Sequence, residues 1–320
     1  MSLLSVENLS VHIGPAHILK GVNFSMERGD TLGFVGESGC GKSMTALAIM
    51  GLLSDQAQVS GRIIYDGQDL LALDDGAMCK IRGRRIAMIF QEPMTALNPV
   101  KTIGFQIAEG PRLHLGLGRA QAESRAISLL DRVGLPAPRF SPDLYPHQLS
   151  GGQRQRVVIA MTIACEPDIL IADEPTTALD VTTQARILDL IADLVEQEGM
   201  ALIMITHDLG VVAETTQNLA VMYAGSLVES GTTAEVYKFL AHPYTRGLFA
   251  AIPHLDSNVE LAPGTLLPTI PGTVPLPTEN LPGCAFADRC QRTQDQCSTT
   301  VPALQGTHQV ACFNPWQAAP

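Results

Sequence analysis

The chain has 320 residues, and 46% of them are hydrophobic, which is enough for one large domain or two smaller ones with a packed core. Its 21 Lys and Arg residues face 32 Asp and Glu residues, and the resulting net charge of -11 disfavours broad electrostatic binding to nucleic acid. No apolar run approaches the roughly 20 residues of a membrane-spanning helix, and the N-terminus lacks the basic and apolar regions of a signal peptide. We therefore expect a cytoplasmic protein that does not bind nucleic acid.

Residues 3–26 predict short strands of an antiparallel sheet, with turns at Gly14 and Gly21. The apolar run at residues 31–35 follows and is typical of a buried strand. It leads directly into residues 36–43, which read Gly-Glu-Ser-Gly-Cys-Gly-Lys-Ser. A helical pattern begins at Met44, so these residues lie between a strand and a helix.

That context identifies residues 36–43 as a phosphate-binding loop rather than a chance glycine turn. Glycines let the backbone wrap closely around a phosphate, and N–H groups at the start of a helix donate to it. We expect Lys42 to reach the β and γ phosphates and Ser43 to bind Mg²⁺. The predicted nucleotide-binding residues of this loop are Gly36, Glu37, Ser38, Gly39, Cys40, Gly41, Lys42, Ser43 and Met44.

Gln91 directly follows an apolar run at residues 85–90 that predicts a core strand. In open α/β sheets, ligands bind at the carboxyl ends of the strands, so Gln91 is a candidate ligand of Mg²⁺ or of a nucleophilic water. Taken alone, a Gln in this place is usually a loop residue. From about residue 102 the pattern becomes helical and predicts an inserted helical subdomain over residues 102–165.

Residues 149–153 read Leu-Ser-Gly-Gly-Gln and precede a strong helical run. A serine and bare backbone at a helix start make a second anion site, formed by Ser150, Gly151 and Gly152. An ordinary serine N-cap is the alternative interpretation.

Asp173 and Glu174 end a fully apolar strand at residues 169–173. We expect Asp173 to hold Mg²⁺ opposite Ser43 and Glu174 to act as the general base for the attacking water, although paired acids at a strand end are often only caps. A further strand at residues 201–205 is expected beside this one. It would place His207 near a γ-phosphate, where it would orient Glu174 and the water. Residues 219–222 and 226–229 predict a closing hairpin.

In this order, the motifs resemble the ATP-binding subunit of ABC transporters over about residues 3–240, and the resemblance implies an ATPase domain at residues 1–240. The resemblance implies an α/β P-loop NTPase core with an N-terminal antiparallel β subdomain and the inserted helical subdomain. It also implies a head-to-tail dimer of ATPase domains that binds ATP and Mg²⁺ between its chains. The residues expected to act in cis on the nucleotide are Lys42, Ser43, Gln91, Asp173, Glu174 and His207, of which Ser43, Gln91 and Asp173 would hold Mg²⁺.

The same resemblance assigns residues 149–153 as a signature stretch that acts on nucleotide bound to the partner chain. Its members are Leu149, Ser150, Gly151, Gly152 and Gln153, and the D-loop after the acidic pair is Ala178, Leu179 and Asp180. One departure from the family pattern is Ile13, which stands where an aromatic ring that stacks on adenine is expected.

Residues 241–320 form a proline-rich, cysteine-containing extension that is expected to be irregular. Its four cysteines have the spacing C-x5-C-x6-C-x14-C, and the extension resembles the tail of ATPases from the dipeptide, oligopeptide and nickel importer family. The cysteines are Cys284, Cys290, Cys297 and Cys312.

The sequence leaves several possible chemical states for these four cysteines. Disulfides are disfavoured in a reducing cytoplasm. A [4Fe-4S] cluster is favoured, because it takes four thiolates and some members of the family carry one. Zinc is the alternative, although the usual C-x2-C knuckles are absent. His308 is an alternative fourth ligand, and free thiols remain the plain interpretation.

The resemblance implies that the chain hydrolyses ATP to power peptide import from the cytoplasmic face of the inner membrane. The implied partners are a second, different ATPase subunit, two transmembrane permease subunits and an extracytoplasmic substrate-binding protein. A nickel-chelate or other small-solute importer is the alternative, and a soluble ABC ATPase without a transporter is disfavoured, because tandem domains and coiled-coil inserts are missing. Because all nucleotide motifs precede residue 240, we expect the ATPase fold to survive removal of the extension.

Overall fold

Two sheets organise the chain in the computed structural model, which describes residues 2–91, 93–177, 179–251 and 269–316. The first sheet is antiparallel and has the strand order β2-β1-β4-β5, which confirms the prediction for residues 3–26. Its strands are β1 (Leu4–Ile13), β2 (Ala16–Met26), β4 (Ala57–Tyr65) and β5 (Gln68–Asp69). Leu4 and Val6 alternate with less buried residues of β1, and after a register shift Leu9 and Val11 are buried in the same way, so one face of this sheet covers the core.

The second sheet has the order β11-β10-β9-β3-β8-β7-β6, and its five strands from β9 to β6 are parallel. Its strands are β3 (Thr31–Val35), β6 (Ile86–Ile89), β7 (Ile169–Asp173), β8 (Ala201–Ile205), β9 (Asn218–Tyr223), β10 (Ser226–Thr232) and β11 (Gln309–Val310). Strand β8 pairs with β7, as predicted, and β9 and β10 form the predicted hairpin. The parallel strands therefore bring the ends of β3, β6, β7 and β8 to one edge.

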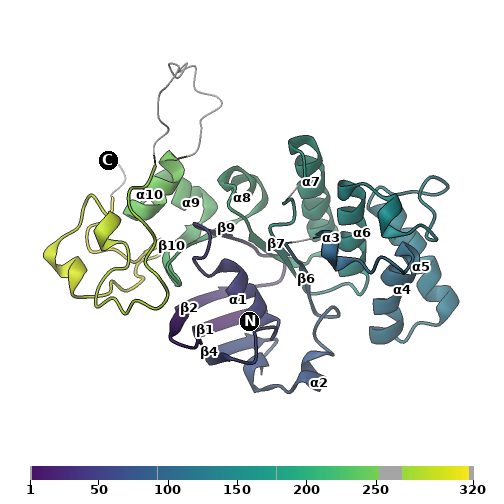
Figure 1. The fold of residues 1–320 in the computed structure, drawn as a ribbon, viewed down its shortest axis with the longest axis horizontal. Coiled ribbons are helices and arrows are strands. Elements are labelled where there is room, and N and C mark those ends of the chain that lie inside the picture. The colour runs from purple at the N-terminus through teal and green to yellow at the C-terminus, as the bar shows by residue number, and fades with distance from the viewer. Residues whose placement is uncertain (1, 92, 178, 252–268, 317–320) are drawn as a thin grey trace, which may run out of the picture.

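Helices cover both faces of this sheet, and a separate helical subdomain extends from the β6 side (Figure 1). The helices of the core are α1 (Lys42–Ile49), α2 (Asp75–Met78), α7 (Val181–Glu198), α8 (Leu209–Thr215) and α9 (Thr233–Phe239). The subdomain contains α3 (Pro93–Ala96), α4 (Ile103–His114), α5 (Arg119–Arg132) and α6 (Gly151–Ile163). Ile107, Leu130 and Ile159 bury their side chains in one cluster there, which explains the spacing of apolar residues in the sequence.

The C-terminal extension is built into the ATPase domain. It begins with α10 (Pro243–Ala250), and its last strand, β11, pairs with β10 through Glu229 and Val310. The side chains of Tyr244 and Phe286 are buried in one cluster with Val221 of β9. The extension completes both the edge of the sheet and part of the core. These contacts argue against the expectation that the ATPase fold survives its removal, and a truncation described in the Discussion tests it.

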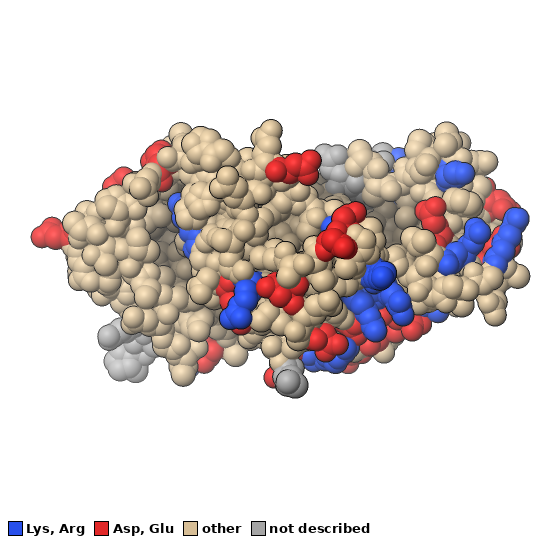
Figure 2. Space-filling view, turned by 90° about the horizontal axis from the view of Figure 1, so that it is seen from below, with Lys and Arg blue, Asp and Glu red and all other residues tan. Residues whose placement is uncertain are grey.

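Charged side chains are unevenly distributed over the surface. On the face shown in Figure 2, acidic and basic side chains interleave over the helical subdomain, whereas the half that carries the extension has few charges. The pair Arg119–Glu123, one turn apart on α5, is an example of this interleaving. Among the described residues, no helix combines the length and the apolar character needed to cross a bilayer.

Candidate functional site

The phosphate-binding loop connects β3 to α1 in a conformation that only glycine adopts readily. Gly39 and Gly41 have φ angles of 80° and 111°, and Gly41 is the N-cap of α1. A Cβ atom on Gly41 would lie 2.6 Å from the Leu19 side chain, so bulk is excluded there as well. The ammonium of the buried Lys42 donates to the carbonyls of Gly36 at 2.8 Å and Glu37 at 3.2 Å. These hydrogen bonds place the Lys42 ammonium inside the loop, beside the start of α1, where the backbone N–H groups of a helix N-terminus favour an anion.

Ser43 and Asp173 meet at the expected place. The hydroxyl of Ser43, in the first turn of α1, donates to Oδ1 of Asp173 at 3.0 Å, although 130 residues separate the two in the chain. Asp173 is buried, and burial raises the pKa of its carboxyl, while the hydrogen bond from Ser43 opposes the shift. A hydroxyl and a carboxylate at this distance are oxygen ligands of the kind that Mg²⁺ binds.

Glu174 receives hydrogen bonds from two directions at the end of β7. Gln91 donates through Nε2 to Oε2 at 3.1 Å, and Thr177 donates through its hydroxyl to the same oxygen at 3.0 Å. Nδ1 of His207 lies 3.4 Å from the other carboxylate oxygen, and 75% of the His207 side chain is exposed. The structure therefore brings Gln91, Glu174 and His207 together, as the sequence predicted, next to the pair formed by Ser43 and Asp173.

The signature stretch begins α6, which lies with the helical subdomain and away from α1 (Figure 1). Ser150 is the N-cap: its hydroxyl accepts from the backbone of Gln153 at 3.4 Å, and the Gln153 side chain accepts from the backbone of Ser150 at 2.9 Å. Ser150 therefore caps α6 in the structure. Leu149 is buried and anchors the stretch, and Gly151 and Gly152 form the first turn of α6.

A surface hollow of about 470 Å³ lies at the signature stretch. Its lining includes residues 150–153 and three arginines, Arg139, Arg156 and Arg186. Burial lowers the pKa of Arg156, and Arg186 adds to this shift. The three arginines, with Asp180 in the same lining, give this hollow an excess of positive charge beside a helix N-terminus.

The D-loop connects the acidic pair to the signature region. Asp180 caps α7 by accepting from the backbone of Thr183 at 3.0 Å and from its hydroxyl at 2.7 Å. Leu179 lines the same hollow as the signature stretch. Ala178 lies outside the described residues.

Two stacked imidazoles, one on β1 and one on β2, flank the turn between these strands, where an adenine-stacking ring was expected. The rings of His12 and His17 lie 3.9 Å apart with an interplanar angle of 17°. Burial lowers the pKa of His17, and the neighbouring His12 adds to this shift. Ile13 pairs with Ala16 in the turn. This turn therefore offers imidazole surface in place of a larger aromatic ring.

The four cysteines of the extension line one small cavity. Three of their sulfurs accept backbone N–H groups at 3.4–3.5 Å, from Arg292, Gln294 and Asn314. Burial raises the thiol pKa of Cys284 to about 11 and also raises the values of Cys290 and Cys312. Within the described part of the chain, however, no group of three or more His, Cys, Asp or Glu side chains has a metal-binding arrangement, so the structure by itself shows no metal centre.

Three residues near the nucleotide loop were not predicted from the sequence. Thr177 binds Glu174, and its place in the turn after the acidic pair is the signal that could have identified it. Tyr244 and Arg289 both bind Glu37 of the phosphate-binding loop. They lie more than 200 residues from Glu37, and the only hint in the sequence is a carboxylate inside a loop that binds anions.

Comparisons with known proteins agree with this geometry. The family model described as "ABC transporter" matches residues 19–177, and that described as "Oligopeptide/dipeptide transporter, C-terminal region" matches residues 228–297. The dipeptide transport ATP-binding protein of Escherichia coli is 45% identical over 95% of this chain and 93% of its own length. The probable peptide ABC transporter ATP-binding protein of Sinorhizobium fredii is 48% identical over 97% and 94%.

Solved structures show the same fold. A dimeric ATP-binding cassette in a post-hydrolysis state, bound to ADP and phosphate, is 29% identical with a TM-score of 0.64, covering 72% of this chain and 98% of its own. A Clostridium perfringens subunit of an ABC transporter complex is 30% identical with a TM-score of 0.65, covering 74% and 90%. The chain therefore belongs to the family of ABC transporter ATP-binding proteins, and its C-terminal part belongs to the oligopeptide and dipeptide transporter branch.

Proposed function

We propose that this chain hydrolyses ATP to power the import of di- or oligopeptides through a membrane complex. The observation that carries the hydrolytic part is the group around Glu174. A half-buried carboxylate is held by Gln91 and Thr177, faces His207, and lies next to the pair formed by Ser43 and Asp173. The peptide part rests on the relatives named for peptide or dipeptide transport, which share almost the whole length of the chain.

Each residue has a distinct task in this proposal. Lys42 would neutralise the β and γ phosphates of bound ATP, and Ser43, Asp173 and Gln91 would hold Mg²⁺, which would supply further charge neutralisation there. Glu174 takes a proton from the attacking water, and His207 fixes the orientation of Glu174 by contact with its second oxygen. Gln91 bridges both tasks because it already donates to Glu174.

The nucleotide site is shared between two chains. The signature hollow faces the surface beside α6, whereas the phosphate-binding loop lies at α1, so we infer that each hollow closes on the nucleotide of a partner. The partner in the transporter is a second, different ATPase subunit, and the isolated chain pairs with its own copy. ATP favours the closed pair only through the contacts that it makes there.

A substitution in the signature stretch tests this division. Ser150→Arg fills the hollow and adds a positive charge at the start of α6, so ATP hydrolysis should fall at least tenfold, while the dissociation constant for MgATP of the isolated chain should stay within twofold. Steady-state phosphate release and isothermal titration calorimetry measure the two quantities. Loss of MgATP binding to the isolated variant would show instead that the signature stretch belongs to the site of its own chain.

The transporter assignment is tested by identifying the membrane proteins that co-purify with the chain. We propose that it binds the cytoplasmic face of the inner membrane through two permease subunits and works with an extracytoplasmic substrate-binding protein. Affinity purification of the tagged full-length chain from detergent-solubilised membranes should recover two polytopic permeases. Recovery of the chain solely from the soluble fraction, without permeases, would favour a non-transport ATPase. A nickel-chelate importer would be identified by uptake that nickel chelates compete for and dipeptides do not.

We further propose a [4Fe-4S] cluster at the four cysteines, with zinc as the alternative occupant. Support comes from the shared cavity and from the N–H groups that point at three of the sulfurs, because such hydrogen bonds stabilise thiolate ligands. The thiol pKa values are raised in the absence of a metal ion. The positive charge of a bound metal ion would lower them and favour thiolates.

Cys297→Ser tests this proposal. Anaerobically purified wild-type protein should contain about four iron atoms per chain and absorb near 400 nm, and the variant should lose most of both. Cys79→Ser is the matched control, because Cys79 is an exposed cysteine outside the extension, and its iron content should equal that of the wild type. One zinc and no iron per wild-type chain would show that the cysteines bind zinc instead of the cluster. The absence of both metals would refute a metal centre.

A further inference from the structure

An arginine of the C-terminal extension reaches the phosphate-binding loop. Arg289 lies at the end of a short 3-10 helix (Ala287–Arg289) and is almost completely buried. Its two terminal nitrogens donate to the two carboxylate oxygens of Glu37, Nη1 to Oε2 at 2.8 Å and Nη2 to Oε1 at 3.0 Å. This bidentate geometry is the strongest form of an arginine–carboxylate pair, and it joins residues that are 252 positions apart.

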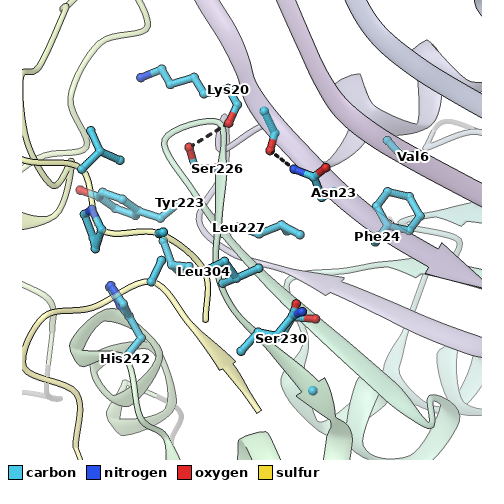
Figure 3. Close-up of a pocket in the computed structure, with 18 of the residues that line it drawn as sticks. Val6, Lys20, Asn23, Phe24, Tyr223, Ser226, Leu227, Ser230, His242 and Leu304 are labelled. Carbon is cyan, nitrogen blue, oxygen red and sulfur yellow. Dashed lines mark hydrogen bonds between the residues drawn. The ribbon is translucent and has the colours of Figure 1, made fainter. Parts of the chain in front are cut away.

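The remaining donors of Arg289 fix the direction of its guanidinium group. Nε donates to the carbonyl of Pro271 at 2.9 Å, and Nη1 donates to the hydroxyl of Tyr223 at 3.2 Å. Tyr223 belongs to β9 and forms part of the wall of a cavity of about 1020 Å³ between β2, β10 and the extension (Figure 3). The pair with Glu37 is the main reason that the pKa of Arg289 rises above its ordinary value. Arg289 is therefore held on all sides as a charged group with one orientation.

The extension also holds the main chain of Glu37. Its backbone N–H donates to the hydroxyl of Tyr244, at the start of α10, at 2.8 Å. The carbonyl of Glu37 in turn accepts from Lys42 at 3.2 Å. Tyr244 thus holds the backbone N–H of Glu37, and Arg289 holds its carboxylate. The carbonyl of the same residue binds Lys42.

We propose that Arg289 is a positioning residue for the ATP site, which acts through Glu37 from the C-terminal extension. It has two effects. It fixes the backbone that holds Lys42, and it compensates a carboxylate that would otherwise repel the phosphates of a bound nucleotide. This inference rests on the proposed binding of ATP at residues 36–43.

The electrostatic part predicts a specific pattern among variants. Arg289→Met leaves Glu37 uncompensated beside the phosphates, so the dissociation constant for MgATP should rise about tenfold, equivalent to about 1.4 kcal/mol. At saturating ATP, kcat should fall less than threefold, because the groups around Glu174 are untouched. Glu37→Gln should change the dissociation constant less than threefold. The double variant should resemble Glu37→Gln, because the repelling charge is then gone.

The matched control is Arg246→Met. Arg246 also lies in the extension, but it is exposed and its guanidinium group stacks over Trp316 at 4.3 Å, within the extension itself. Its MgATP affinity should equal that of the wild type. Arg289→Lys keeps the charge but loses the bidentate fork, so its affinity should lie between those of the wild type and Arg289→Met.

Isothermal titration calorimetry of MgATP with the full-length chain measures all these affinities, and circular dichroism verifies that each variant is folded. A wild-type chain that does not bind MgATP would refute the proposed function itself. If the wild type binds and Arg289→Met binds equally well, the role of Arg289 is refuted. Equal losses in Arg289→Met and Arg246→Met, or additive losses in the double variant, would show that the arginine only supports the fold.

Discussion

Replacing Glu174 by Gln should reduce ATP hydrolysis at least a hundredfold while the protein still binds MgATP. The carboxylate is the general base in the proposed mechanism, and removal of such a group costs a factor of 10² to 10⁴. Glutamine has nearly the same size and can still accept hydrogen bonds from Gln91 and Thr177, so the surroundings should persist. Phosphate release at saturating MgATP measures the loss.

The same variant should accumulate a closed dimer, because nucleotide that is not hydrolysed continues to bridge two chains. Size-exclusion chromatography with light scattering should show a dimer of Glu174→Gln with MgATP and a monomer without it. Glu198→Gln is the matched control, since Glu198 pairs with Arg132 at the end of α7. Its hydrolysis rate should be that of the wild type. Normal turnover by Glu174→Gln would contradict the assignment of the general base.

Removing residues 241–320 should abolish stable folding of the ATPase domain. The truncated chain would lose β11 from the edge of the sheet and would expose the core cluster around Tyr223 and Val221. Loss of a single buried aromatic side chain typically costs about 3–5 kcal/mol, which is comparable to the whole stability of many domains. Expression tests and thermal unfolding should give an insoluble chain or one without a cooperative transition.

Two point substitutions at Tyr244 measure how much its buried ring contributes to stability while the rest of the extension stays in place. Tyr244→Ala should lower the free energy of unfolding by about 3–5 kcal/mol, because the side chain of Tyr244 is fully buried. Tyr244→Phe keeps the ring and loses only the hydrogen bond to Glu37, so it should cost about 1 kcal/mol. A soluble 1–240 fragment with wild-type thermal stability would show that the extension is an independent appendage.

The sequence predicts most of the nucleotide site because its residues are placed by local rules. Residues 36–43 follow one strand and begin a helix, and Gln91, Glu174 and His207 each follow a buried strand. Once these strands are parallel neighbours, their carboxyl ends meet at one edge. The convergence observed around Glu174 was therefore predictable from strand ends alone.

The role of the extension was not predictable by the same reasoning. Strand β11 has only two residues, too few to show alternation, and the path of Arg289 to Glu37 depends on tertiary packing of a proline-rich segment. The irregular character of the extension was predicted correctly. That several of its side chains, such as Tyr244 and Phe286, are buried in the core was not. The part at residues 252–268 lies outside the described residues.

Uptake of a radiolabelled dipeptide tests the central claim most directly. Cells that lack this gene should recover ATP-dependent uptake when they express the wild-type chain, and should remain at background when they express Glu174→Gln at the same level. Excess unlabelled dipeptide should compete with the label. Equal uptake in cells that express Glu174→Gln, or uptake that does not depend on the chain at all, would contradict the conclusion that its ATP hydrolysis powers peptide import.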